Sequence, residues 1–345
     1  KIVAATTKAT TSDDYLAKAT SILSSGLTIG DEKSVPIFEK IIELSQKALK
    51  DNQKNSLAYS YIARAKVGLG DYKDAIEYAN KSISFDSLNS NAYFARGNAK
   101  SQLEDFKGAI DDFNKTIELD PEFSFVYSNR GNDKESLGDH QGAIKDFSKA
   151  IELDPEYLEA YIGRGNSKNS LENFKGAIED FNKAIELDPE DAYAYAHRGY
   201  SKNELKDFKG AIKDFNKAIE LDPEDAYAYA SRGKAKDYLG EYFDAIYDFT
   251  RAIEIDPKNS DYYNKRCLSK FKMEKYKSAL RDCDIALSIN SENEIAYDSR
   301  GDVKLALGDK QGACSDYKSA ITNGYKQREK YLSSKEGEWC KNMPN

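Results

Sequence analysis

Apolar and small residues return along this chain with a fixed period of 34 residues. Five Asp-Pro steps mark the period, at Pro121, Pro155, Pro189, Pro223 and Pro257. Units framed on this spacing follow one another eight times, from Ser56 to Gln327, without an insertion. A repeat of this length is typical of chains in which stacked helical units bury their apolar faces against their neighbours.

Each unit carries two amphipathic helical patterns. The fourth place is Tyr in all eight units, the eighth is small, the twentieth is Ala and the twenty-fourth is usually aromatic. Places four, seven, eight and eleven share one helical face, and places twenty, twenty-four and twenty-seven share another. Small residues at places eight and twenty allow two helices to approach closely. The pattern therefore predicts a helix, a turn and an antiparallel second helix in every unit.

The turn residues indicate where these helices begin and end. In six units a short polar residue precedes the second helix and is expected to cap its free backbone amides: Asp71, Asp105, Asp139, Asn173, Asp207 and Asp309. The Asp-Pro step ends the second helix, because the residue before proline is disfavoured in the α region.

This pattern resembles the tetratricopeptide repeat family, whose helix–turn–helix unit carries a large aromatic residue, then Leu-Gly, then Ala and then Pro. The resemblance covers residues 56–327, about four fifths of the chain. It implies an all-α fold, an α-solenoid of stacked antiparallel helix pairs forming a right-handed superhelix. In such a superhelix the first helices line a concave groove. One departure is an Arg where the family usually has Leu before the glycine.

The two ends of the chain depart from the repeat. We expect a flexible lead over residues 1–12 and a divergent capping helix pair over 13–55, with helices at 13–23 and from Pro36 to about Lys50. Residues 328–345 are expected to form a C-terminal cap and tail, with Tyr331 and Trp339 covering the last pair.

Four cysteines are too few to require a disulfide framework. Cys314 lies on the last second helix and Cys340 lies in the tail that folds back over it. A disulfide between Cys314 and Cys340 and two unlinked thiols both stay open. Cys267 and Cys283 occupy the eighth and twenty-fourth places of one unit, where we expect small hydrophobic residues that replace Gly and Phe.

Seven units share a charged set, with Arg at the seventh place, Lys at the eleventh and Asp at the twenty-third. The unit that begins at Ser56 lacks the Arg and the Asp together, carrying Ile62 and Tyr78. A row of cations for a polyanion is one interpretation. We favour a structural ion-pair ladder, because the joint loss indicates mutual neutralisation. Its central members are Arg130, Asp146, Arg164, Asp180, Arg198, Asp214, Arg232 and Asp248.

Places two, five, nine, twelve and thirteen are expected to point into the groove, and they vary between units. Asparagine amides there both donate and accept, so a row of them suits the backbone of an extended peptide, while aromatic residues add apolar contact area. The alternative is that the amides are merely solvated and the tyrosines pack between units. The candidate groove residues are Asn98, Asn132, Asn166, Asn169, Asn203, Phe94, Phe125, Tyr193, Tyr200, Tyr227 and Tyr238.

Two further features bear on the groove. Some family members bind a C-terminal carboxylate with Lys at the fifth place, but that place holds residues such as Phe94, Ser128 and Ile162 here. Recognition by that clamp is therefore not expected. Carboxylates gather towards the C-terminal end, at Asp237, Asp261, Asp298 and Asp302, and favour a basic partner segment there.

The formal charge of −8 disfavours binding to nucleic acid or to an anionic membrane, and no apolar run approaches the length of a membrane span. The chain begins with Lys, so we expect a processed or trimmed product. A cytoplasmic location and export after removal of a signal peptide both stay open.

The only histidines are His140 and His197, and no catalytic, phosphate-binding or zinc motif accompanies them. We expect no enzymatic activity, no cofactor and no metal. The sequence predicts a binding scaffold for proteins or extended peptides. The alternative is a structural spacer or self-assembling repeat protein, although we expect a monomer with at most weak self-association.

Overall fold

The computed structural model describes residues 11–23, 34–334, 337–341 and 343. The chain divides into two compact units, residues 1–173 and 174–345, which are described separately. The described residues form α-helices joined by turns, and no strand occurs among them. This is the all-α architecture expected from the repeat.

The first unit contains nine of the described helices. They are α1 (Ser12–Leu23), α2 (Val35–Asp51), α3 (Ser56–Gly68), α4 (Tyr72–Phe85), α5 (Ser90–Gln102), α6 (Phe106–Leu119), α7 (Ser124–Ser136), α8 (His140–Leu153) and α9 (Leu158–Ser170). The observed α1 and α2 match the predicted divergent pair within one residue at each end. Residues 1–10 of the predicted lead lie outside the described residues. Ser12, the last residue of that lead, belongs to α1.

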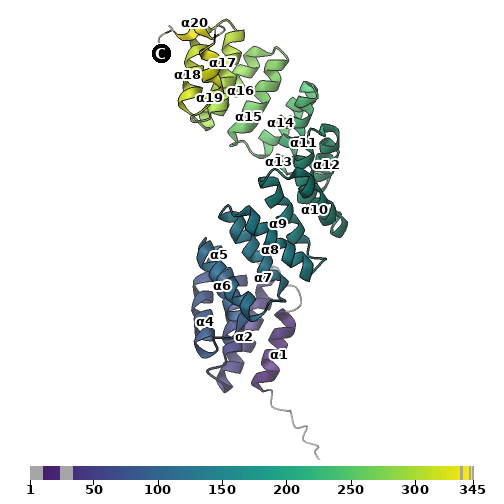
Figure 1. The fold of residues 1–345 in the computed structure, drawn as a ribbon, viewed down its shortest axis with the longest axis vertical. Coiled ribbons are helices and arrows are strands. Elements are labelled where there is room, and N and C mark those ends of the chain that lie inside the picture. The colour runs from purple at the N-terminus through teal and green to yellow at the C-terminus, as the bar shows by residue number, and fades with distance from the viewer. Residues whose placement is uncertain (1–10, 24–33, 335–336, 342, 344–345) are drawn as a thin grey trace, which may run out of the picture. The chain divides into compact units, whose positions relative to one another are not determined.

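The second unit contains the remaining helices of the described residues. They are α10 (Phe174–Leu187), α11 (Ala192–Glu204), α12 (Phe208–Leu221), α13 (Ala226–Tyr238), α14 (Tyr242–Ile255), α15 (Ser260–Lys272), α16 (Tyr276–Ile289), α17 (Glu294–Ala306), α18 (Lys310–Thr322), α19 (Lys326–Leu332) and α20 (Glu338–Lys341). Within each unit the helices stack in chain order (Figure 1).

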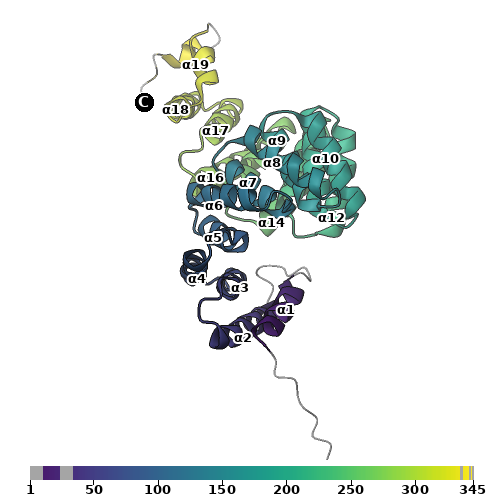
Figure 2. The ribbon, with the colours of Figure 1, turned by 60° about the horizontal axis from the view of Figure 1, so that its bottom comes forward.

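Within each unit the repeats are helix pairs, and the second helix of one pair packs on the first helix of the next, as α4 does on α5 and α12 does on α13. The first helices of successive pairs also contact one another. In the first unit α3 packs on α4, α5 on α6 and α7 on α8, while α3 contacts α5 and α5 contacts α7. In the second unit α11 contacts α13, α13 contacts α15 and α15 contacts α17. Figure 2 gives a second view of the stacked pairs. The first helices of each unit therefore lie side by side and form one layer.

The core of each pair is a large side chain against a small one. Phe215 is fully buried, and a Cβ atom added to Gly199 would lie 2.9 Å from its ring. Gly131 faces Phe147 in the same way at 3.0 Å. Ala at the twentieth place is buried in every repeat: Ala75, Ala109, Ala143, Ala177, Ala211, Ala245, Ala279 and Ala313. The invariant small residues thus set the distance between the two helices.

Four of the six predicted caps are confirmed, Asp71 differs, and the cap at Asn173 stays a prediction. Asp105, Asp139, Asp207 and Asp309 each accept a hydrogen bond from the backbone amide three residues ahead. Asp71 makes no such bond; its carboxylate pairs with Lys66 at 2.6 Å instead. The residue before the N-cap position of the second helix has a positive φ in all eight repeats: Gly70, Glu104, Gly138, Glu172, Lys206, Gly240, Glu274 and Gly308.

Candidate functional site

Six of the seven arginines at the seventh place form an ion pair within a unit of the structure. Arg130 is typical: Nη2 donates to Asp146 Oδ1 at 2.6 Å, Nε donates to Oδ2 at 2.8 Å, and Lys134 Nζ lies 2.7 Å from Oδ2. The same contacts recur in the pairs Arg96–Asp112, Arg198–Asp214, Arg232–Asp248, Arg266–Asp282 and Arg300–Asp316. Arg164 and Asp180 belong to different units, and their pairing stays a prediction.

The arginine also reaches the preceding repeat. Arg198 Nη1 donates to Asn182 Oδ1 at 2.8 Å, and Arg232 Nη1 donates to Asn216 Oδ1 at 2.7 Å. This second partner of the arginine was not predicted from the sequence. A signal for it was present, because the twenty-fifth place holds a short polar residue in each case: Asn80, Asn114, Ser148, Asn182, Asn216, Thr250 and Asp284. Each of the six paired arginines therefore links two successive second helices and helps to set the register between repeats.

The invariant Tyr at the fourth place belongs to the same assembly. The Arg198 guanidinium lies 5.3 Å from the Tyr195 ring centroid, and Arg232 lies 5.4 Å from Tyr229. Asp214 is 4% exposed and Asp248 is fully buried. These charged groups pair with one another within the fold, so the repeated cations do not form a free surface for a polyanion.

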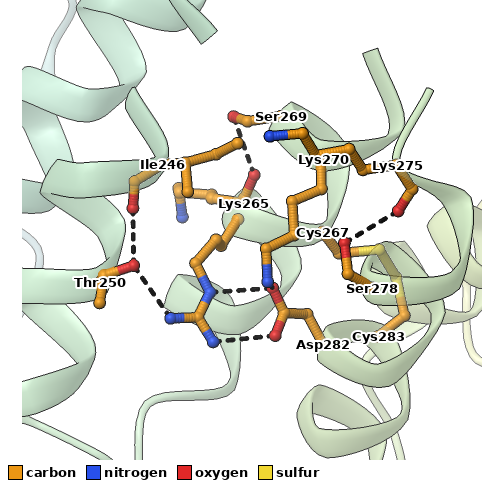
Figure 3. A network of polar contacts seen from close by, with 11 residues as sticks. Ile246, Thr250, Lys265, Cys267, Ser269, Lys270, Lys275, Ser278, Asp282 and Cys283 are labelled. Atoms are coloured by element: carbon orange, nitrogen blue, oxygen red, sulfur yellow. Dashed lines mark hydrogen bonds and ion pairs between the residues drawn. A yellow bond between two sulfur atoms is a disulfide. The ribbon is translucent and has the colours of Figure 1, made fainter. Parts of the chain in front are cut away.

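The expectation for Cys267 and Cys283 was wrong, because the two residues form a disulfide. Figure 3 shows it beside Asp282. Arg266 Nη2 lies 2.8 Å from Asp282 Oδ1, and Arg266 Nη1 donates to Thr250 Oγ1 at 3.0 Å. The reason is geometric: the eighth and twenty-fourth places meet, as the contact of Gly199 with Phe215 shows. When both hold Cys, the sulfur atoms occupy the space that the aromatic ring fills elsewhere.

The C-terminal segment closes the last repeat. Cys314 and Cys340 form a disulfide, and both are fully buried. The Trp339 and Tyr331 rings contact the buried Tyr317 at centroid distances of 6.4 and 6.2 Å. The tail thus covers the apolar edge that the last helix pair would otherwise expose.

Three of the four carboxylates expected to attract a basic segment are closely paired within the chain. Asp298 forms an ion pair with Arg328 of α19, which also lies 3.0 Å from Asp302. Asp237 pairs with Lys272 and accepts from Ser269 Oγ at 2.8 Å. The Asp261 side chain is 63% exposed, and its nearest cation is Lys265 Nζ at 3.9 Å, so binding of a basic segment at this end stays a prediction.

The asparagine row of the first unit lies along the first helices. Asn129 Nδ2 donates to Asn98 Oδ1 at 2.7 Å, which joins α7 to α5, and Asn132 is exposed on α7. Asn166 and Asn169 are partly buried on α9. Phe125 is 48% exposed. We call Asn98, Phe125, Asn129 and Asn132 the amide surface.

Two predicted groove residues belong to the core instead. Phe94 is 7% exposed, and its ring lies 4.7 Å from that of Phe123 and 6.2 Å from that of Phe113. Asn203 is 4% exposed. The fifth and twelfth places lie next to the neighbouring helices, so a side chain there is covered by the stack.

The tyrosines of the second unit gather on α11 and α13. Tyr193 and Tyr227 are 46% and 38% exposed, and the His197 ring stacks between them at centroid distances of 3.9 and 5.6 Å. Burial lowers the pKa of His197 to about 4, so the imidazole is neutral at physiological pH. Tyr200 is partly buried, and Tyr238 is 60% exposed and stacks on Phe208 at 5.0 Å. We call Tyr193, His197, Tyr227 and Tyr238 the tyrosine surface.

No cluster of three or more side chains suited to a metal ion occurs among the described residues. Within the same part of the chain, no helix is long and apolar enough to cross a membrane.

Comparison with known proteins places the repeats in a family. Sequence models of the tetratricopeptide repeat match residues 90–123, 124–157, 158–191 and 192–225, and a second such model matches residues 58–87. The first four ranges coincide with the repeats framed on the Asp-Pro steps, and residues 58–87 lie within the repeat that begins at Ser56. The chain is a tetratricopeptide repeat protein. Chains of this class are interaction scaffolds that bind proteins or peptides.

Solved structures share the fold. A tetratricopeptide repeat protein from Parabacteroides merdae is 21% identical with a TM-score of 0.59, over 70% of this chain and 97% of that one. The APC/C hetero-tetramer Cut9-Hcn1 is 19% identical with a TM-score of 0.58, over 86% of this chain and 55% of that one. PilF of Pseudomonas aeruginosa is 18% identical with a TM-score of 0.52, over 63% of this chain and 95% of that one. No curated protein sequence matches the chain.

Proposed function

We propose that this chain is a non-enzymatic scaffold that binds extended peptide or protein segments on its first helices, through the amide surface and the tyrosine surface. The observation that supports the proposal is a difference between the constant and the variable places of the repeat. The constant Tyr, Arg, Lys and Asp are used in contacts within and between repeats. The variable first-helix places instead expose amide and aromatic groups, such as Asn132, Tyr193 and Tyr227.

The chemistry of both surfaces suits peptides. An amide side chain donates and accepts at once, so it pairs with a peptide backbone without reading side chains. Tyrosine buries a large area while keeping a hydroxyl for hydrogen bonding, and it is enriched among interface anchors. Tyr193, His197 and Tyr227 form an already ordered stack, which reduces the entropy lost when a partner binds.

A peptide array tests the proposal. Purified full-length protein is applied to an array of peptides of varied composition, and the strongest binders are resynthesised for titration. Three variants are compared with the wild type: Phe125→Ala with Asn132→Ala, Tyr193→Ala with Tyr227→Ala, and a control on α14.

The control is Phe243→Ala with Tyr247→Ala, because these side chains are 71% and 58% exposed on a second helix. All the substituted aromatic side chains are substantially exposed, so thermal unfolding should change little in each variant. Loss of capture in a first-helix variant, with capture intact in the α14 control, supports the proposal. Undiminished capture by both first-helix variants would overturn it.

The alternative role as a self-associating spacer makes a different prediction. End-to-end stacking of chains requires an open apolar edge on the last repeat, and Trp339 and Tyr331 cover that edge through Tyr317. Light scattering over a range of concentrations separates the two roles. A constant monomer mass supports the binding scaffold, and a mass that grows with concentration supports self-association.

A further inference from the structure

The outward face of one second helix carries aromatic residues where the other second helices carry polar ones. Places eighteen and twenty-two of the repeat lie one helical turn apart, and both are exposed in every repeat. In seven repeats they hold charged or polar residues: Lys73 and Glu77, Lys107 and Asp111, Gln141 and Lys145, Lys175 and Glu179, Lys209 and Lys213, Lys277 and Arg281, and Gln311 and Ser315. On α14 they hold Phe243 and Tyr247.

The fold leaves these two aromatic side chains open. Phe243 is 71% exposed and Tyr247 is 58% exposed, and neither ring stacks on another ring or on a cation of the described residues. The other repeats form the same helix pair with solvated residues at these places, so helix packing does not require an aromatic residue at either one. Neighbouring exposed apolar side chains of this kind mark an interaction surface.

Cations flank the two rings on both sides. The Arg232 guanidinium joins α14 to α12, because it donates to Asp248 Oδ1 at 2.6 Å and to Asn216 Oδ1 at 2.7 Å. Arg266 joins α16 to α14 in the same way. The helices α12, α14 and α16 therefore lie side by side with α14 in the middle. Places eighteen and twenty-two of the two flanking helices hold four exposed cations: Lys209, Lys213, Lys277 and Arg281.

These four cations are not neutralised within the chain. Among the described residues no carboxylate oxygen lies within 4.0 Å of any of them. On α4, α6 and α10 the same two places hold one lysine and one carboxylate, so the two charges offset each other. Asp244 is the one carboxylate at places eighteen, nineteen and twenty-two of α12, α14 and α16. The surface is therefore aromatic along its centre and positive along both edges.

We propose that this surface binds an acidic segment of another protein. An apolar residue of the segment packs on the rings of Phe243 and Tyr247, and carboxylates on either side of it pair with the cations of α12 and α16. We call the two aromatic residues and the four cations the aromatic–basic surface. It lies on the second helices, so this inference does not depend on the function proposed for the first helices.

The spacing of the helices sets the spacing of the segment. Packed helices that lie side by side are about 10 Å apart, and an extended chain rises about 3.3 Å per residue. A segment that crosses α12, α14 and α16 therefore needs carboxylates about three residues before and about three residues after its apolar residue.

A short acidic segment fits this surface better than an anionic membrane does. The formal charge of the chain is −8, which repels an extended negative surface. A short segment instead meets the nearby cations alone, because charges more than about 8 Å away are screened at physiological ionic strength.

Fluorescence anisotropy of labelled peptides, titrated with the full-length protein, tests the proposal. The acidic probe has capped ends and a Phe with a pair of Glu residues on each side, about three residues away, in a background of Ser and Gly. A second peptide carries Gln in place of each Glu, and a third carries Ser in place of the Phe. We expect saturable binding of the acidic probe and at least about tenfold weaker binding of the other two peptides.

Charge reversal on the protein locates the binding. Lys213→Glu with Arg281→Glu should weaken binding of the acidic probe at least about tenfold, which corresponds to about 1.4 kcal/mol. The matched control is Lys107→Glu with Lys145→Glu, which changes the net charge equally at exposed places of the first unit and should alter the affinity less than about twofold. Thermal unfolding should stay close to that of the wild type in both variants. Equal weakening in both would show that the attraction is unspecific and would overturn the proposal.

The aromatic residues separate this inference from the proposed function. The Phe243→Ala and Tyr247→Ala variant should weaken binding of the acidic probe, while the two first-helix variants keep the affinity of the wild type. Peptides that bind the first helices should show the opposite pattern, so each surface supplies the control for the other. An acidic probe that is lost from the first-helix variants alone would refute the aromatic–basic surface and leave the proposed function standing.

Three further results would overturn the proposal. They are the absence of saturable binding of the acidic probe, equal binding of the peptide that carries Gln, and retention of the protein on anionic vesicles in place of peptide binding. The last result would assign the same residues to a membrane surface.

Discussion

Replacing one ladder carboxylate by its neutral isostere tests the structural role of the ladder. Asp214 is 4% exposed and accepts from Arg198 Nε at 2.9 Å and from Nη2 at 2.7 Å, and Lys202 Nζ lies 2.7 Å from its Oδ2. Asp214→Asn keeps the size of the side chain but removes its charge. Arg198 and Lys202 would then face each other without a counter-charge.

The expected loss of stability follows from these contacts. Removing one partner of a buried ion pair costs about 3–5 kcal/mol, and the Arg198 and Lys202 side chains retain 16% and 22% exposure that softens the repulsion. We therefore expect Asp214→Asn to lower the free energy of unfolding by about 3 kcal/mol, the lower end of that range.

Urea unfolding followed by circular dichroism measures this loss, and hydrogen exchange locates it at α11 and α12. The matched control is Glu220→Gln on α12, which removes an exposed pair with Lys217 and should cost less than about 0.5 kcal/mol. A loss below about 1 kcal/mol for Asp214→Asn would refute the reasoning, because the ladder would then be dispensable.

Three further predictions concern single features of the fold. Glu104 has a φ of 63°, so Glu104→Gly should stabilise the chain by about 1 kcal/mol in urea unfolding, whereas Gly138→Glu at a φ of 79° should destabilise it by a similar amount. Burial raises the pKa of Asp133 to about 6, so the protonated form of this side chain is favoured in the fold. The free energy of unfolding should therefore rise by about 1 kcal/mol as pH falls from 7.5 to 5, and Asp133→Ser should remove that part of the pH profile. Reducing the disulfide between Cys267 and Cys283 should cost about 3 kcal/mol, measured by hydrogen exchange of α15 and α16, and Cys267→Gly with Cys283→Phe should make this region insensitive to reductant.

Most of the helices could be predicted from the sequence because the same helical pattern recurs in eight units. Places such as Gly199 and Phe215 recur in nearly every unit, so a local pattern becomes a reliable signal for close packing of two helices. The pairing of Arg with Asp was also visible, because both are absent from the unit that holds Ile62 and Tyr78. This joint absence can be seen only because eight units of the same chain can be compared with one another.

The features that the sequence analysis missed depend on contacts between repeats. The bond of Arg198 to Asn182 crosses from one helix pair to the next, and its spacing of 16 residues has no meaning within one helix. Phe94 looked like a groove residue because its place varies between units, yet its ring packs on Phe113 and Phe123. Variation in residue type at one place of the repeat therefore does not by itself indicate that the side chain is exposed to solvent.

The disulfide between Cys267 and Cys283 was missed for a related reason. Each cysteine was judged against the residue that it replaces, and each replacement alone is unremarkable. Their joint occurrence at the eighth and twenty-fourth places was the signal, because Gly199 and Phe215 meet at those places.

Titration calorimetry with an array-selected peptide tests the central claim most directly. The peptide is titrated into the wild type, the Phe125→Ala and Asn132→Ala variant, the Tyr193→Ala and Tyr227→Ala variant, and the α14 control. The proposal predicts an affinity at least about tenfold weaker in one first-helix variant, about 1.4 kcal/mol, with the α14 control unchanged. An affinity that falls only in the α14 control, or in none of the variants, would contradict binding by the first helices.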